Sequence, residues 1–138
     1  MSTPGIGVII NELIGHEDTV RLYNESLGKK IIEAELDKID NRLIITFEDG
    51  NRIAIFDDGQ SCCETRYMTT DDDLLFLANT KLVDIQLEDA PNVEDEFGEH
   101  EVQFLIIKTD KGDITLETHN EHNGYYGGFA VVIKEAGG

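Results

Sequence analysis

An Asp-Gly pair at Asp49 and Gly50 is the feature that most constrains how this chain can fold. Short apolar stretches flank the pair, over residues 43–47 and 52–56. Asp-Gly is a strong hairpin signal, because both residues tolerate the positive φ of a tight turn between antiparallel strands. The pattern therefore predicts an antiparallel hairpin, and similar apolar stretches along the chain predict β-meanders.

Two segments carry the signals of short helices. Residues 19–27 place apolar side chains at helical spacing, and Gly28 follows at a position that favours glycine. Residues 72–79 follow Thr70 and have Asp residues in the first turn, where acids complement the helix dipole. Each helix precedes three predicted strands, over 31–36, 43–47 and 52–56 in the first half and over 82–87, 102–108 and 113–118 in the second, and a last strand is predicted over 129–134.

The two halves of the chain resemble each other, which predicts a weak internal repeat of residues 19–56 and 72–118. A chain of 138 residues is long enough to bury a core of ordinary size. We therefore expect a single α+β domain over residues 1–138. Its antiparallel β-meanders would form one curved sheet or two packed sheets, with two short helices.

The charge of the chain excludes one large class of function. The sequence has 29 Asp and Glu against 11 Lys and Arg, a formal net charge of −18. Nucleic-acid binding depends on neutralising phosphates with cations, so direct binding of DNA or RNA is not expected. The acidity fits three interpretations: solubility or a high-salt habitat, attraction to a basic partner protein, or imitation of nucleic acid on another protein's binding site.

The sequence also predicts where the protein resides. No apolar run approaches the roughly 20 residues of a membrane span. The N-terminal residues lack the basic start and the small-residue cleavage site of a signal peptide. We therefore expect a cytoplasmic protein that does not bind membranes.

Two polar clusters each follow the third strand of one half. They are DDGQSCCETRYMTTDDD at 57–73 and THNEHNGYYGGF at 118–129. If the halves are related by symmetry, the clusters leave equivalent strand ends, and we expect them to lie near each other rather than at opposite poles. Their aromatic faces and hydrogen-bonding groups predict a site for a planar ligand such as a nucleotide base. The candidate ligand-binding residues are Gln60, Arg66, Tyr67, His119, Asn120, His122, Asn123, Tyr125 and Tyr126.

Catalytic and metal-binding interpretations of these clusters are weaker. Cys62 and Cys63 are adjacent, so a bridge between them is strained, and we expect reduced thiols that serve mainly in packing. A thiol nucleophile paired with His119 or His122 is the alternative. The two histidines could bind zinc or iron with a nearby acid, and residues 71–73 could bind Mg²⁺ or Ca²⁺, but both patterns are weak. We therefore predict no catalytic residue, no metal and no cofactor.

The pairing of DDGQSCCETRYMTTDDDL with THNEHNGYYGGF resembles a small family of uncharacterised proteins that phages, prophages and bacteria encode. The resemblance spans residues 28–133, and the two clusters are its most specific parts. It implies a small accessory protein of mobile elements. Such a protein would act in the host cytoplasm, and the family brings no established activity or catalytic residue.

These observations predict a non-catalytic accessory protein that counters a host system. It would sequester a small nucleotide-like ligand in a pocket formed by residues 57–73 and 118–128. The alternative is an acidic mimic of nucleic acid that docks on a basic host protein. A metal- or thiol-dependent enzyme is the third interpretation. Unpaired edge strands make a homodimer reasonable.

Overall fold

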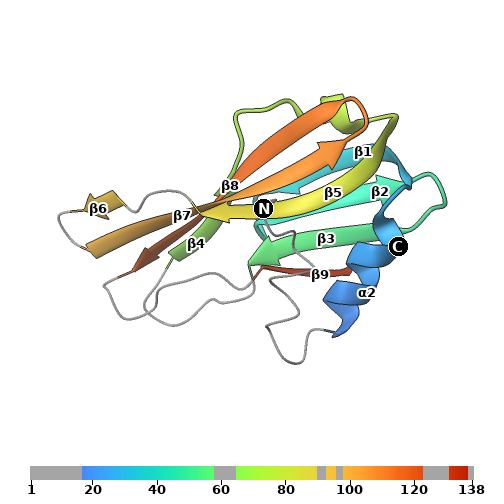
Figure 1. The fold of residues 1–138 in the computed structure, drawn as a ribbon. Coiled ribbons are helices and arrows are strands. Elements are labelled where there is room, and N and C mark those ends of the chain that lie inside the picture. Colours follow the sequence, from blue (N-terminus) through green and yellow to red (C-terminus); the bar gives the residue numbers. More distant parts are fainter. Residues whose placement is uncertain (1–16, 58–64, 90–92, 96–97, 123–130, 137–138) are drawn as a thin grey trace, which may run out of the picture.

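The computed structural model describes residues 17–57, 65–89, 93–95, 98–122 and 131–136 (Figure 1). Strands dominate this part of the chain, with one α-helix and one short 3-10 helix. The elements are α2 (Glu17–Ser26), β1 (Lys30–Asp37), β2 (Arg42–Phe47), β3 (Arg52–Asp57), β4 (Thr65–Thr69), η1 (Leu74–Leu77), β5 (Thr80–Asp89), β6 (Val93–Asp95), β7 (Gly98–Thr109), β8 (Gly112–His122) and β9 (Val131–Glu135).

The strands form one antiparallel sheet in the order β4-β8-β7-β5-β1-β2-β3-β9, with β6 paired to β7 off this path. It consists of two meanders, β1-β2-β3 and β5-β7-β8, joined where β1 pairs with β5. The two edge strands are exchanged between the meanders. β4 follows β3 in the chain but pairs with β8, whereas β9 follows β8 but pairs with β3. This exchange brings the ends of the two meanders together.

The predicted hairpin at Asp49 and Gly50 is confirmed as the connection between β2 and β3. Gly50 has a φ of 89°, in the region that favours glycine, and its N–H donates to the carbonyl of Phe47 at 3.0 Å. The Asp49 carboxylate accepts a hydrogen bond from the N–H of Asn51 at 2.9 Å. The Asp49 side chain and Gly50 therefore both stabilise the turn.

A single core lies between the two meanders. The inward residues of β2, such as Leu43 and Ile45, share this core with Leu105 and Ile107 of β7. Residues at alternate positions of a strand point to the same face, so each strand contributes every second side chain. The largest fully buried side chains are Phe47, Ile31, Leu43, Ile45, Ile55, Leu77, Leu82, Ile85, Leu105 and Ile107.

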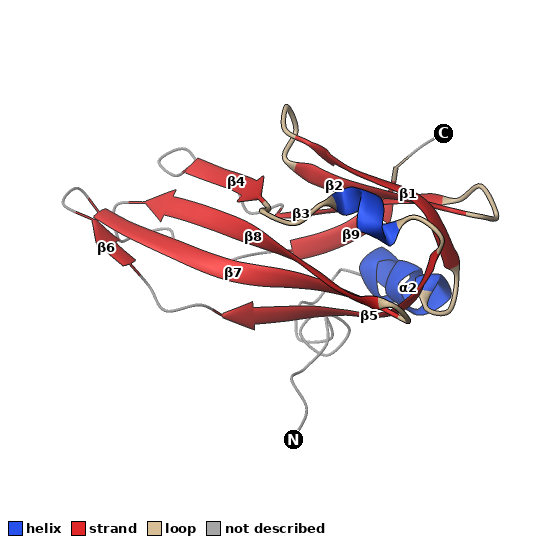
Figure 2. Ribbon diagram, turned by 90° about the horizontal axis from the view of Figure 1, so that it is seen from above, coloured by secondary structure: helices blue, strands red, loops and turns tan. Residues whose placement is uncertain are grey.

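Helix α2 packs at one end of the sheet, beside β9 (Figure 2). Its Leu22 is 6% exposed and joins the core. The Thr19 hydroxyl accepts a hydrogen bond from the N–H of Ile133 at 3.2 Å and donates to the carbonyl of the same residue at 3.1 Å. The Tyr23 hydroxyl donates to Asp84 of β5. The helix thus connects an edge strand of one meander to a strand of the other.

The expectation of an α+β fold with two helices is wrong, because the described chain is mostly one antiparallel sheet with a single α-helix. The helix predicted at 19–27 is present as α2, but the one predicted at 72–79 is only the 3-10 turn η1. The side chains of Thr70 and Asp72 instead bind the backbone of Thr115 in β8, at 2.8 Å each. Asn79, with a φ of 66°, then ends the turn before β5 begins.

The predicted strands are all present where the chain is described, but three extend further than expected. β5 covers Thr80–Asp89, β7 covers Gly98–Thr109, and β8 covers Gly112–His122. β8 therefore includes both histidines of the second cluster, which we expected in a loop. No helix of the described residues is long and apolar enough to cross a membrane.

Candidate functional site

The described residues of the two polar clusters pair with each other across the sheet. Asp57, the first residue of the first cluster, pairs with Val131, which follows the second. Within the clusters, the strand Thr65–Thr69 pairs with Glu117–Glu121. The described parts of the two clusters therefore lie side by side, as we expected.

Several of the candidate residues fall outside the described part of the chain. These are Gln60, Asn123, Tyr125 and Tyr126, together with both cysteines, Cys62 and Cys63. The structure describes only the backbone of Arg66, in β4, and of His122, in β8. Tyr67, His119 and Asn120 are described in full, and the structure brings all three to the β4–β8 strand pair.

β4 was not predicted, although its sequence, Thr-Arg-Tyr-Met-Thr, is rich in β-branched and aromatic residues. Met68 is 4% exposed and joins the core, whereas Tyr67 and Thr69 belong to the other face of the strand. These five residues pair in register with Glu117–Glu121 of β8. The alternation around Met68 is the local signal that could have identified the strand.

Tyr67 and His119 are direct cross-strand partners whose rings stack. The ring centroids are 4.5 Å apart and the planes differ by 8°. The Tyr67 hydroxyl donates to a carboxylate oxygen of Glu121 at 2.5 Å, and His119 Nε2 lies 2.8 Å from the Thr69 hydroxyl. Both rings are thus fixed by polar contacts as well as by the stack.

In the Tyr67–His119 stack, the His119 ring lies toward the interior of the sheet and the Tyr67 ring lies at the edge of the described sheet. His119 pairs with Val102 of β7 on the side away from Tyr67. β4 is the terminal strand of the described sheet, so no described strand lies beyond Tyr67. Among the described strands, the row Val102–His119–Tyr67 therefore ends at Tyr67, whose side chain is only partly buried.

The opposite face of the same strands becomes polar where the core ends. Leu116 of β8 is fully buried, and the next inward positions, Thr118 and Asn120, are 1% and 0% exposed. Thr118 pairs with Gln103 of β7, and Asn120 pairs with Arg66 of β4. Burial of an amide costs free energy unless the amide forms hydrogen bonds. The interior next to the two clusters is therefore a polar environment.

Two side chains approach the same ring nitrogen of His119. The Thr69 hydroxyl and a carboxylate oxygen of Glu117 lie 2.8 and 3.7 Å from Nε2. In a catalytic triad the acid and the nucleophile bond different ring nitrogens, so Thr69 and Glu117 do not form a triad with His119.

The structure separates the two histidines of the weak metal-binding pattern. His119 and His122 both belong to β8, and successive positions of a strand alternate between faces. Positions 119 and 122 therefore fall on opposite faces. Within the described ranges, no three His, Cys, Asp or Glu side chains gather closely enough to hold a metal ion. Two acids of the predicted Mg²⁺ or Ca²⁺ site at 71–73 already accept backbone hydrogen bonds: Asp72 from the N–H of Thr115, and Asp73 from that of Leu75.

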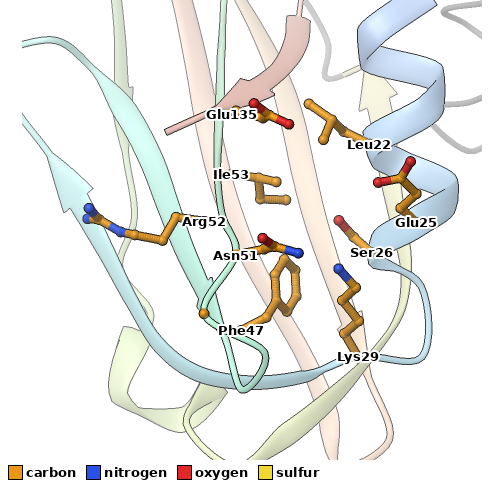
Figure 3. Close-up of a pocket in the computed structure, with 10 residues that line it drawn as sticks. Leu22, Glu25, Ser26, Lys29, Phe47, Asn51, Arg52, Ile53 and Glu135 are labelled. Carbon is orange, nitrogen blue, oxygen red and sulfur yellow. The ribbon is translucent and has the colours of Figure 1, made fainter. Parts of the chain in front are cut away.

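A pocket of about 200 Å³ lies between α2 and the β2–β3 turn (Figure 3). No local sequence pattern predicts this pocket, because its lining comes from segments that are distant in the chain. Figure 3 shows Leu22, Glu25 and Ser26 on the helix side and Arg52 and Ile53 on the strand side. The lining residues are Leu22, Glu25, Ser26, Lys29, Phe47, Gly50, Asn51, Arg52, Ile53 and Glu135.

Residues 24–132 match the model of a family described as a domain of unknown function, DUF7448. The matched range contains both meanders and the whole of the β4–β8 strand pair. Comparison with curated proteins and with solved structures gave no match.

Proposed function

The chain belongs to the DUF7448 family, and from this premise we propose that it is a non-catalytic binding protein for a planar ligand such as a nucleotide base. The ligand would stack on the outer face of Tyr67, at the edge of the sheet. Residues of the two polar clusters that lie outside the described part of the chain would supply its hydrogen bonds.

The observation that carries the proposal is the row Val102–His119–Tyr67. Its two rings are stacked at 4.5 Å, close to the spacing of about 4.8 Å between neighbouring strands. A base stacked on Tyr67 would occupy the position that a side chain of a further strand would have in this row. Stacking of a base on an aromatic side chain is worth about 1–3 kcal/mol and depends little on which base is bound.

The polar contacts of the rings support a binding role. Glu121 holds the Tyr67 hydroxyl, and Thr69 contacts His119, so the stacking platform is already ordered before a ligand arrives. Preorganisation of this kind reduces the entropy that binding must overcome.

The charge of the protein bears on the kind of ligand. A net charge of −18 repels anions. We infer that Arg66, the chain neighbour of Tyr67, offsets this repulsion when the ligand carries phosphate. An uncharged nucleoside needs no such help. Its binding should therefore be less sensitive to Arg66→Ala than the binding of the matching nucleotide.

We infer further that the protein is an accessory factor of phages or other mobile elements and acts in the host cytoplasm. It would sequester its ligand and so deprive a host defence system of a small-molecule signal. The motif resemblance over residues 28–133 supports this role.

A mass spectrum of the small molecules released from purified protein tests the proposal. A nucleotide or nucleoside should be released from the parent protein and not from Tyr67→Leu. Tyr67→Phe is the matched control, because it keeps the ring and should retain the ligand. If no planar molecule is released, and no nucleoside or nucleotide from a standard panel binds the parent at millimolar concentration, the proposal is wrong.

A further inference from the structure

A second hollow adjoins the pocket of Figure 3, because Lys29 lines both. Its volume is about 390 Å³, and it lies where β1 and β5 join the two meanders. This junction consists of two paired positions, Lys30 with Lys81 and Ile31 with Thr80. The residues that line the hollow are Gly28, Lys29, Lys30, Glu48, Asp49 and Lys81.

Lys30 and Lys81 are direct cross-strand partners, so two ammonium groups project from the same side of the sheet. Like charges directly opposite each other in an antiparallel pair repel and cost free energy. In the described part of the chain, neither side chain forms an ion pair with a carboxylate. Glu48 lines the same hollow, and its N–H donates to the carbonyl of Lys30, but within the described residues its carboxylate forms no ion pair with either lysine.

The balance of charge around the two hollows differs from that of the whole chain. Together they are lined by four of the 11 Lys and Arg but by only four of the 29 Asp and Glu. Three of these four acids are already paired with cations. Asp49 binds Lys29 at 2.8 Å, and Glu25 and Glu135 both lie within 4 Å of Arg21, at 3.3 and 3.8 Å.

We propose that this junction is a binding site for a small organic phosphate. A phosphate monoester carries close to two negative charges near neutral pH, which matches the two charges of Lys30 and Lys81. Its oxygens would accept hydrogen bonds from both ammonium groups and remove their mutual repulsion. The site belongs to other strands than the Tyr67 platform and does not depend on the function proposed for it.

The adjoining pocket determines which phosphates fit. Its floor includes the buried side chains of Leu22, Phe47 and Ile53, next to the polar groups of Ser26 and Asn51. A volume of about 200 Å³ accepts a small ring or a short chain but not a second large group. A phosphate on Lys30 and Lys81 would let an attached organic group pass Lys29 into this pocket. The site therefore favours a small amphiphilic phosphate over inorganic phosphate.

Calorimetric titration of inorganic phosphate and of phenyl phosphate tests the site. The proteins compared are the parent, Lys30→Gln, Lys81→Gln and the control Lys38→Gln, all at constant ionic strength. Lys38 is exposed and lies outside both hollows. The parent and the control should bind phenyl phosphate more tightly than inorganic phosphate. Each of the two other variants should lose at least about tenfold in affinity, since each removes one charge-assisted contact.

Thermal unfolding without phosphate shows whether a variant has lost the site or its fold. Lys30→Gln and Lys81→Gln should be at least as stable as the parent, because each removes a like-charge repulsion. Equal affinity of all four proteins would overturn the proposal, since it would indicate diffuse attraction only. Absence of binding to the parent would overturn it as well. Equal affinity of the parent for both probes would remove the role of the adjoining pocket.

Discussion

The ring of Tyr67 in β4 lies parallel to the ring of His119 in β8, with centroids 4.5 Å apart. This contact joins two polar clusters that are far apart in the chain. It exists because the edge strands are exchanged: β4 leaves its own meander and pairs with the last strand of the other. The platform is therefore a product of the sheet topology and not of either cluster alone.

The hydrogen bonds between Thr19 and the edge strand β9 predict that Thr19→Val lowers the free energy of unfolding. Thr19→Val keeps the shape of the side chain but leaves the N–H and the carbonyl of Ile133 without this hydroxyl. Leaving buried polar groups unsatisfied costs about 1–3 kcal/mol of unfolding free energy. Urea unfolding should show this loss for Thr19→Val and a smaller one for Thr19→Ser, which keeps the hydroxyl. Equal losses would mean that the methyl group, not the hydroxyl, stabilises the contact.

Tyr23 predicts a loss of stability at high pH. Burial, and then the hydrogen bond to Asp84, raise the pKa of Tyr23 to about 12, above the value of about 10 in an unfolded chain. Its contribution is therefore fully present below about pH 10 and is lost as the pH rises from about 10 to about 12. Urea unfolding at pH 8 and pH 11 should show a smaller fall in stability for Tyr23→Phe than for the parent.

Two glycines differ in what a side chain would meet. Gly50 has a φ of 89° and open space around it, whereas Gly112 has a φ of 141° and lies 3.1 Å from Phe76 at the position of an added Cβ. Gly50→Ala should cost about 1 kcal/mol of unfolding free energy through backbone strain alone. Gly112→Ala should cost about 2–3 kcal/mol, because few other residues adopt this φ. Thermal unfolding of both variants shows which loss of stability is larger. A larger loss for Gly50→Ala than for Gly112→Ala would contradict the prediction.

The salt bridge of Lys29 predicts a shift that NMR can measure. The hydrogen bond from Lys29, and then the N–H of Asn51, hold the pKa of Asp49 below its usual value. Lys29→Met should raise that pKa. Because the folded pKa is lowered, Asp49 stabilises the fold above its unfolded pKa, and this effect is lost as the pH falls through the folded pKa.

Asp37 is the internal control for that measurement. Its pKa is lowered first by the N–H of Asp40 and then by that of Ile39, with no contribution from Lys29. A carboxyl titration followed by carbon-detected NMR should therefore show a change at Asp49 and none at Asp37. Equal shifts at both positions would indicate a general change in charge rather than the loss of one contact.

The local parts of the fold could be predicted from the sequence. The Asp49-Gly50 turn, helix α2 and seven of the strands follow from residue patterns within short windows. The second helix could not be predicted correctly, because Thr70 and Asp72 bind the backbone of Thr115, about 45 positions away. The sequence pattern of a helix cap does not show whether its side chains bind the next turn of a helix or the backbone of a distant strand.

The candidate site was only half accessible to sequence reasoning. The composition of the two clusters identified Tyr67, His119 and Asn120 as polar or aromatic residues of interest. The strand pairing that makes Tyr67 and His119 a stack, and buries Asn120, depends on register, which is set by contacts along the whole sheet. The pocket beside α2 had no local signal at all, since its walls meet only in the folded chain.

The most direct test of the account is the affinity of a nucleoside panel for the parent, Tyr67→Phe and Tyr67→Leu, measured by calorimetry. We predict that the parent and Tyr67→Phe bind at least one nucleoside with similar affinity. Tyr67→Leu should bind it about tenfold or more weakly, which corresponds to the loss of one stacking contact of about 1–3 kcal/mol. Equal affinity of Tyr67→Leu and the parent would contradict the assignment of this ring as the binding platform.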